Sequence, residues 1–232
     1  MFYKYLKKRS STSLGCILVS TLLMCSHSVY ALPVTPPVTP LENQPYALCA
    51  GAVTFNFDNV AYAKCQKMSG NSLGLTHKYP VQNNIQTVND IGALAPNPFI
   101  VSTYSPPNPN EYALYDCRKQ GSFAQCNGGI CSTNSSGKEF PSLGVLSQNE
   151  IVCSCPISSS RLYNVWGPSE CPTTKQDYDA ICASGSQKVT SADGYSLHIG
   201  SDGPSSTLVA FSDLYDEKFQ TQSTVNKCRR PQ

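Results

Sequence analysis

A Gly-x-Ser-x-Gly pattern is the first feature of this sequence that could do chemistry. Residues 70–74 read Gly-Asn-Ser-Leu-Gly, which matches the sharp turn that exposes the nucleophilic serine of many hydrolases. Asp193 and His198 follow in the serine, acid, histidine order of that class, so His198 could activate Ser72. That fold also needs a helix after the serine, but residues 75–80 are too few and end in proline. We therefore interpret the pattern as a turn and keep a small serine hydrolase as an alternative.

Other titratable residues offer weaker candidates for catalysis. His77 and His198 could share a metal ion or act as base and acid, but we favour structural or surface roles for both. A carboxylate pair for glycoside hydrolysis remains a further alternative, since its separation is spatial. The acidic residues considered for such a pair are Asp177, Asp179, Asp213, Asp216 and Glu217, which we interpret as solvated helix faces. We commit to no catalytic residue and no cofactor.

Ten cysteines follow the first 31 residues. They are Cys49, Cys65, Cys117, Cys126, Cys131, Cys153, Cys155, Cys171, Cys182 and Cys228. An even number in an exported chain predicts five disulfide bridges, although the spacing does not give their connectivity. Cys153 and Cys155 lie two residues apart in a strand-like run, so we expect each to bond a different partner. Zinc is the alternative, but paired Cys knuckles and nearby histidines are missing, and we predict no metal.

The first 31 residues have the layout of an export signal that is removed. Residues 4–9 carry four basic side chains, residues 14–25 are mostly apolar, and Val29-Tyr30-Ala31 suits a cleavage site. The alternatives are a retained anchor, for which the apolar run is short, and a lipoprotein at Cys25, for which Met24 is a poor neighbour. No later segment is long and apolar enough to span a membrane, so we expect a soluble mature chain, secreted or periplasmic.

Net charge excludes two classes of partner. The whole chain has 17 basic and 15 acidic residues, and four of the basic residues belong to the export signal. The mature chain is therefore slightly acidic, which gives no basic footprint for nucleic acid and no polybasic segment for a membrane surface.

The mature chain reads as a proline-rich flexible tether over residues 32–48 and a mainly β domain over residues 49–232. Five prolines in the tether favour extended chain without sheet pairing. Alternation from Val53 to Phe57, a turn at Asp58-Asn59 and a return over residues 60–64 predict a hairpin in which Phe55 faces Tyr62. Further strands are expected at residues 99–104, 112–117 and 150–155, and more weakly at 188–190 and 196–199.

Two short helices complete the predicted fold, a single disulfide-rich domain with antiparallel hairpins. Thr174 to Asp177 resembles a capping box that opens a helix to about Ala183. A second helix is expected where apolar residues recur at helical spacing. Those residues are Leu208, Phe211, Tyr215 and Phe219.

Tyr163 and Trp166 are the candidate binding residues, because they lie in a turn-rich stretch that holds the only tryptophan. Exposed aromatic side chains on loops make rigid contacts with proteins or sugars. The alternative is that Trp166 packs on the core. Asn134-Ser135-Ser136 is an acceptor sequence for N-glycosylation if the source glycosylates exported proteins.

The sequence therefore favours an exported, non-catalytic binding or interaction module whose partner is an extracellular protein or glycan. Low charge density and abundant serine, threonine and asparagine suit a surface that contacts other molecules. The alternatives are a small secreted hydrolase and a structural component of the envelope.

Overall fold

The computed structural model describes residues 38–75, 99–183 and 197–232. The predicted export signal, His77, the weak strand at 188–190 and Asp193 lie outside these ranges. Among the described residues, no helix combines the length and the apolar character needed to cross a membrane.

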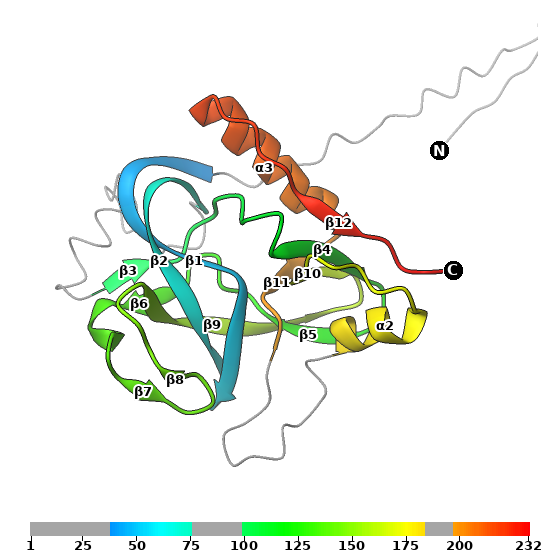
Figure 1. The fold of residues 1–232 in the computed structure, drawn as a ribbon, viewed down its shortest axis with the longest axis horizontal. Helices are drawn as coiled ribbons and strands as arrows, with labels where there is room; N and C mark the ends of the chain where they lie inside the picture. The colour runs from blue at the N-terminus through cyan, green and yellow to red at the C-terminus, as the bar shows by residue number, and fades with distance from the viewer. Residues whose placement is uncertain (1–37, 76–98, 184–196) are drawn as a thin grey trace, which may run out of the picture. The chain divides into compact units, whose positions relative to one another are not determined.

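Over these residues the fold is mainly β, as predicted, with two short α-helices and five disulfide bridges (Figure 1). The strands are β1 (Val38–Phe57), β2 (Val60–Leu75), β3 (Phe99–Val101), β4 (Tyr112–Cys117), β5 (Gly121–Ala124), β6 (Ile130–Ser132), β7 (Glu139–Phe140), β8 (Gly144–Val145), β9 (Glu150–Ser160), β10 (Tyr163–Pro168), β11 (Gly200–Asp202) and β12 (Asn226–Cys228). The helices are α2 (Lys175–Ala183), α3 (Ser206–Phe219) and the 3-10 turn η2 (Thr133–Ser135).

The larger sheet has the strand order β1-β2-β9-β6-β3, with β5 paired to the far half of β9. It curls until its two ends meet, because a parallel bridge joins Ala47 of β1 to Ser102 directly after β3. The Thr103 N–H donates to the Ala47 carbonyl over 3.2 Å at this closure. The strands thus enclose a common interior, into which the cysteines of β1, β2, β6 and β9 project.

The β1–β2 hairpin has the predicted register. Phe57 pairs with Val60 and Phe55 with Tyr62, whose rings stack with centroids 5.1 Å apart. Asp58 and Asn59 both take positive φ values, 48° and 64°, as a two-residue hairpin turn requires. Local alternation and turn chemistry were therefore sufficient to place this hairpin.

The predicted tether is wrong over residues 38–48, which form the first half of β1. Pro40 pairs with Leu73 and Pro45 with Ser69 along β2. β1 stands at one end of the larger sheet, and the bridge at Ala47 touches only part of its outer side. Proline is tolerated in such an edge strand, where a missing N–H donor costs no ladder hydrogen bond.

The smaller sheet has the order β11-β10-β4-β12, and the stretch predicted to be turn-rich is its central strand β10. Antiparallel neighbours flank β10 on both sides, while β12 joins β4 in parallel. The Ala124 N–H donates to the His198 carbonyl over 2.9 Å, so β5 links the two sheets through the chain that leads into β11.

Both predicted helices are present. Thr174 Oγ1 accepts from the Asp177 N–H at 3.1 Å and also donates to the Asp177 carboxylate, which is the expected cap of α2. α3 buries Leu208 and Phe211 against the core. α2 packs beside β4, and α3 comes directly before β12 in the order of elements (Figure 1).

Gly200 is a point where two neighbouring strands of the smaller sheet, β10 and β11, leave no room for a side chain. A β-carbon there would lie 2.3 Å from the Asn164 carbonyl oxygen, which belongs to the backbone of β10 and cannot yield. We expect Gly200→Ala to lower the free energy of unfolding by about 2 kcal/mol, as other overpacked sites do. Urea denaturation measures this loss.

The matched control is Gly137→Ala. Its β-carbon would meet open space, so only the left-handed backbone at φ 75° opposes it, and it should cost about 1 kcal/mol. Equal effects at the two glycines would show that β10 and β11 are not packed as closely as described.

Candidate functional site

Five disulfides hold the described domain together, as the cysteine count predicts. The bridges are Cys49–Cys65, Cys117–Cys182, Cys126–Cys155, Cys131–Cys153 and Cys171–Cys228. Cys153 and Cys155 bond different partners, as expected from their places on β9. Disulfides of this number are consistent with an extracellular or other oxidising compartment.

Three cysteine sulfurs in the interior of the larger sheet lie close enough to hold a metal ion in principle. The Sγ atoms of Cys49, Cys65 and Cys153 all lie within 4.8 Å of one another. They belong to two neighbouring bridges, however, and a bonded sulfur offers no thiolate to a metal. The proximity therefore reflects two disulfides that stack in the core.

Ser72 does not lie on the strand-to-helix turn that its sequence pattern suggested. It is fully buried within β2, where it pairs with Leu41. Thr103 Oγ1 donates to Ser72 Oγ over 2.8 Å, which ties β2 to the segment after β3. The serine is thus a buried hydrogen-bond acceptor in a sheet, out of contact with solvent.

The other candidate catalytic residues are dispersed. His198 is half-buried before β11, and burial lowers the pKa of its imidazole. Asp177 is the hydrogen-bond partner of Thr174 in the cap of α2, while Asp216 accepts hydrogen bonds from Thr221 and Ser223 and so fixes the chain that leaves α3. These roles are structural.

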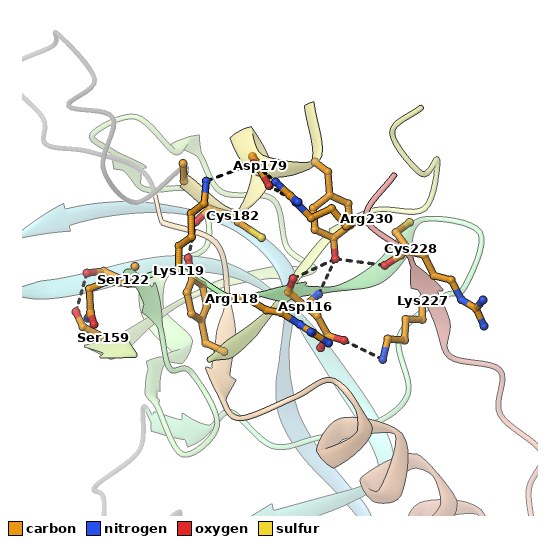
Figure 2. A pocket seen from close by; sticks show the side chains of 16 residues that line it. Asp116, Arg118, Lys119, Ser122, Ser159, Asp179, Cys182, Lys227, Cys228 and Arg230 are labelled. Atoms are coloured by element: carbon orange, nitrogen blue, oxygen red, sulfur yellow. Dashed lines mark hydrogen bonds and ion pairs between the residues drawn. The ribbon is translucent and has the colours of Figure 1, made fainter. Parts of the chain in front are cut away.

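An open groove of about 980 Å³ lies between α2, the start of β5 and the C-terminal residues that follow β12 (Figure 2). Basic side chains dominate its lining, with five cations against two carboxylates. The cations are Arg118, Lys119, Lys227, Arg229 and Arg230, and the carboxylates are Asp116 and Asp179. A cleft lined by one sign of charge concentrates the field and attracts ligands of the opposite sign.

The two carboxylates are already engaged by part of this set. Asp179 binds Arg230 through two hydrogen bonds, one of 2.6 Å from Nε, and also meets Lys119 at 3.5 Å. Figure 2 shows Asp179 between these two side chains, and Lys227 turned towards Asp116 at a separation of 2.9 Å. Arg118 and Arg229 are exposed and have no acidic partner among the described residues. The groove therefore has spare positive charge.

Tyr178 of α2 fixes the floor of the groove. Its hydroxyl accepts from the Asp116 N–H at 2.9 Å and lies 3.2 Å from the Asp116 carbonyl and 3.4 Å from that of Cys228. The ring is buried against Tyr115, and burial raises the pKa of the Tyr178 phenol. One side chain thus joins α2, β4 and β12.

Two disulfides fix the walls of the basic groove. Cys117–Cys182 joins the end of β4 to the end of α2, and Cys171–Cys228 joins the chain before α2 to β12. Because its walls are covalently tied, the groove keeps its shape without a ligand, which lowers the ordering cost of binding.

The two carboxylates of the groove are both held ionised. The hydrogen bond from Arg230 is the main reason why the pKa of Asp179 falls to about 2. Burial by itself raises the pKa of Asp116, but hydrogen bonds from the Ser205 N–H and Lys227 outweigh it and leave that pKa below its ordinary value.

Because the pKa of the Asp179 carboxyl is lowered, the ion pair of Asp179 with Arg230 is sensitive to acid. Its contribution to stability is complete above about pH 4, where the carboxyl is ionised in both states, and disappears as the pH falls towards about 2. We therefore expect Asp179→Asn to be less stable than the parent above pH 4, with the gap closing between pH 4 and 2. Urea denaturation of both proteins across this range measures the gap, and a gap independent of pH would contradict the pairing.

Tyr163 and Trp166, the predicted binding residues, are not on an exposed loop. Both lie in β10 and are only 1% and 4% exposed. Tyr163 is one of the residues that line the basic groove; its ring stacks on Phe123, and its hydroxyl donates to the Cys182 carbonyl at 2.5 Å. Trp166 lines a different, apolar cavity. Their part in binding stays a prediction.

No protein-family model, curated protein or solved structure matches this chain.

Proposed function

We propose that the protein is a non-catalytic extracellular or periplasmic binding module, and that the basic groove binds an anionic part of an extracellular protein or glycan. The observation that carries this proposal is the charge of Arg118 and Arg229, which have no acidic partner among the described residues, in a groove whose walls are tied by disulfides. Guanidinium groups bind carboxylate, sulfate and phosphate through paired hydrogen bonds.

Neutral polar groups complete the lining. Gln120, Ser122 and Ser159 lie on the β5 side, and the hydroxyls of the two serines bond each other over 2.7 Å. Amides and hydroxyls of this kind can hydrogen-bond a ligand backbone or sugar hydroxyls beside the charged groups. The groove thus combines charge attraction with positions for neutral contacts.

Isothermal titration calorimetry of the mature chain tests this proposal with three probes: a short heparin-type sulfated oligosaccharide, a glutamate-rich peptide and a neutral dextran oligosaccharide. We expect at least one anionic probe to bind, with affinity that falls as salt screens the charges, and the dextran not to bind. The anionic probe that binds more tightly indicates whether the partner is a glycan or a protein. Failure of both anionic probes at low salt, or equal binding of dextran, would contradict the proposal.

The hydrolase alternative makes the opposite prediction for Ser72. Because this serine is buried and hydrogen-bonded, a serine-directed phosphonate should leave the folded protein unlabelled. Labelling that disappears in Ser72→Ala would instead favour a hydrolase.

A further inference from the structure

A second, apolar cavity lies apart from the basic groove, where β1, the segment after β3, β10, β11 and α3 meet. Its volume is about 210 Å³. The side chains of Tyr104, Trp166 and Phe211 line it together with Leu208 and Ile199, and all five residues are less than a tenth exposed. The buried core therefore forms much of the cavity wall, which more polar residues complete.

Covalent bonds hold two sides of this cavity. Cys49 and Cys126 both line it, and they are bonded to Cys65 of β2 and Cys155 of β9. A flexible core would collapse on an apolar hollow, because unfilled space in a core costs stability. Walls tied by disulfides resist such collapse, so the cavity persists as a preformed site.

Trp166 lines the cavity and brings a side-chain donor, its indole N–H. Trp166 is 4% exposed, and its main-chain N–H donates to the Ile199 carbonyl over 2.9 Å. Its indole N–H, by contrast, has no acceptor among the residues that the structure describes, and it is not sealed from solvent, so a ligand can reach it. Buried tryptophans usually satisfy this donor. The hydroxyl of Tyr104, another residue of the lining, is hydrogen-bonded to Ser212 Oγ.

A buried polar atom without a partner belongs to the same lining. Asn127 Oδ1 is buried and has no hydrogen-bond partner within the described part of the chain. Two residues that line one mostly apolar cavity therefore offer a buried acceptor, at Asn127, and a donor without a protein partner among the described residues, at Trp166. A buried polar atom without a partner costs free energy, which a suitable ligand would recover.

We propose that this cavity binds a small neutral molecule that consists of one ring and an adjoining amide or hydroxyl group. An amide or hydroxyl can accept from the Trp166 indole and donate to Asn127, while the ring fills the apolar space. An apolar cavity of about 150 Å³ accommodates benzene, so this slightly larger volume suits a ring with a short substituent. The only charged residue of the lining is Asp202, which disfavours the anions that suit the basic groove.

Trp166 is the only tryptophan of the chain, so its fluorescence reports directly on this cavity. We would titrate the mature protein with N-benzylacetamide, with ethylbenzene as the matched probe that has the ring but lacks the amide. The proposal predicts a saturable change of Trp166 emission, with the amide binding about 3- to 10-fold more tightly than ethylbenzene, as one or two net hydrogen bonds allow. No saturable change up to the solubility limit, or equal affinity of the two probes, would overturn it.

Variants that fill the cavity from two sides locate the binding. Leu208→Phe and Ala50→Leu add volume from α3 and from β1, so at least one folded variant should lose the emission change. Trp166→Phe keeps a ring but removes the donor. Measured by calorimetry, it should weaken the amide several-fold and leave ethylbenzene within about 2-fold.

Three results would contradict the cavity as the site. Binding that survives in both filled variants would place the probe elsewhere, and an unchanged amide affinity in Trp166→Phe would remove the role of the indole. A blocked peptide with a central phenylalanine that binds far more tightly than N-benzylacetamide would replace the small molecule by a protein partner. Charge reversal in the basic groove should leave all these titrations unchanged, which separates this inference from the proposed function.

Discussion

Replacing Cys117 and Cys182 together by alanine is expected to lower the free energy of unfolding by about 4 kcal/mol. The bridge spans 65 residues of sequence, so its loss frees a long loop in the unfolded chain. It also removes a covalent wall of the basic groove. Urea denaturation of the double variant measures the change.

The Cys49–Cys65 pair is the matched comparison, since it spans only 16 residues. Its removal should cost about 1 kcal/mol less than removal of Cys117–Cys182, because the entropy of loop closure grows slowly with length. A loss below about 1 kcal/mol for either pair, or thermal melting unchanged by reductant, would show that the bridges are not what stabilises this fold.

Reversing the charges of Arg118 and Arg229 in the groove should weaken binding of the anionic probe about 100-fold. Arg118→Glu with Arg229→Glu removes two charge-assisted hydrogen bonds of about 1.5 kcal/mol each and adds repulsion. Neither arginine has an acidic partner among the described residues, so the fold should retain its melting temperature within a few degrees. Calorimetry at one fixed salt concentration measures the affinity.

Two further variants sharpen this prediction. Lys67→Glu with Lys138→Glu makes the same change of net charge outside the groove and should alter affinity by less than about 3-fold, through long-range charge alone. Asp179→Asn should act in the opposite sense, since it frees Arg230 and Lys119 for the ligand. If the control pair weakens binding as much as the arginine pair, net charge rather than the groove determines affinity.

Local patterns in the sequence were reliable where neighbouring residues determine the structure. The Phe55–Tyr62 hairpin depends on alternation and on the Asp58-Asn59 turn, and α2 depends on a capping box of four residues, Thr174 to Asp177. The cysteine count predicted the bridges, but the pairing required the strand order that brings β9 between β2 and β6. Connectivity is a property of the sheet, which spacing does not reveal.

Long-range pairing explains what the sequence analysis missed. Pro40 and Pro45 seemed incompatible with a sheet, yet they lie in a strand at the sheet's end. Trp166 stands among turn-forming residues, but its strand is buried because β4 and β11 flank it.

The net charge of the chain did not indicate the basic groove, which also depends on contacts between residues distant in the sequence. Net charge averages over the chain, whereas the groove gathers Arg118-Lys119 after β4 and Lys227 to Arg230 near the C-terminus. One local signal was available, since both basic runs adjoin cysteines, at Cys117 and at Cys228. Bridges at those positions bring the two runs towards α2.

The most direct test of the central claim is a map of amide chemical shifts in the isotope-labelled mature protein as the stronger anionic probe is added. The account predicts saturable shifts at the groove, above all at Arg118, Lys119 and Arg229, with the residues around Trp166 unchanged. Shifts centred instead on Lys67, Lys138 or the apolar cavity, or no saturable shifts at low salt, would contradict a function carried by this groove.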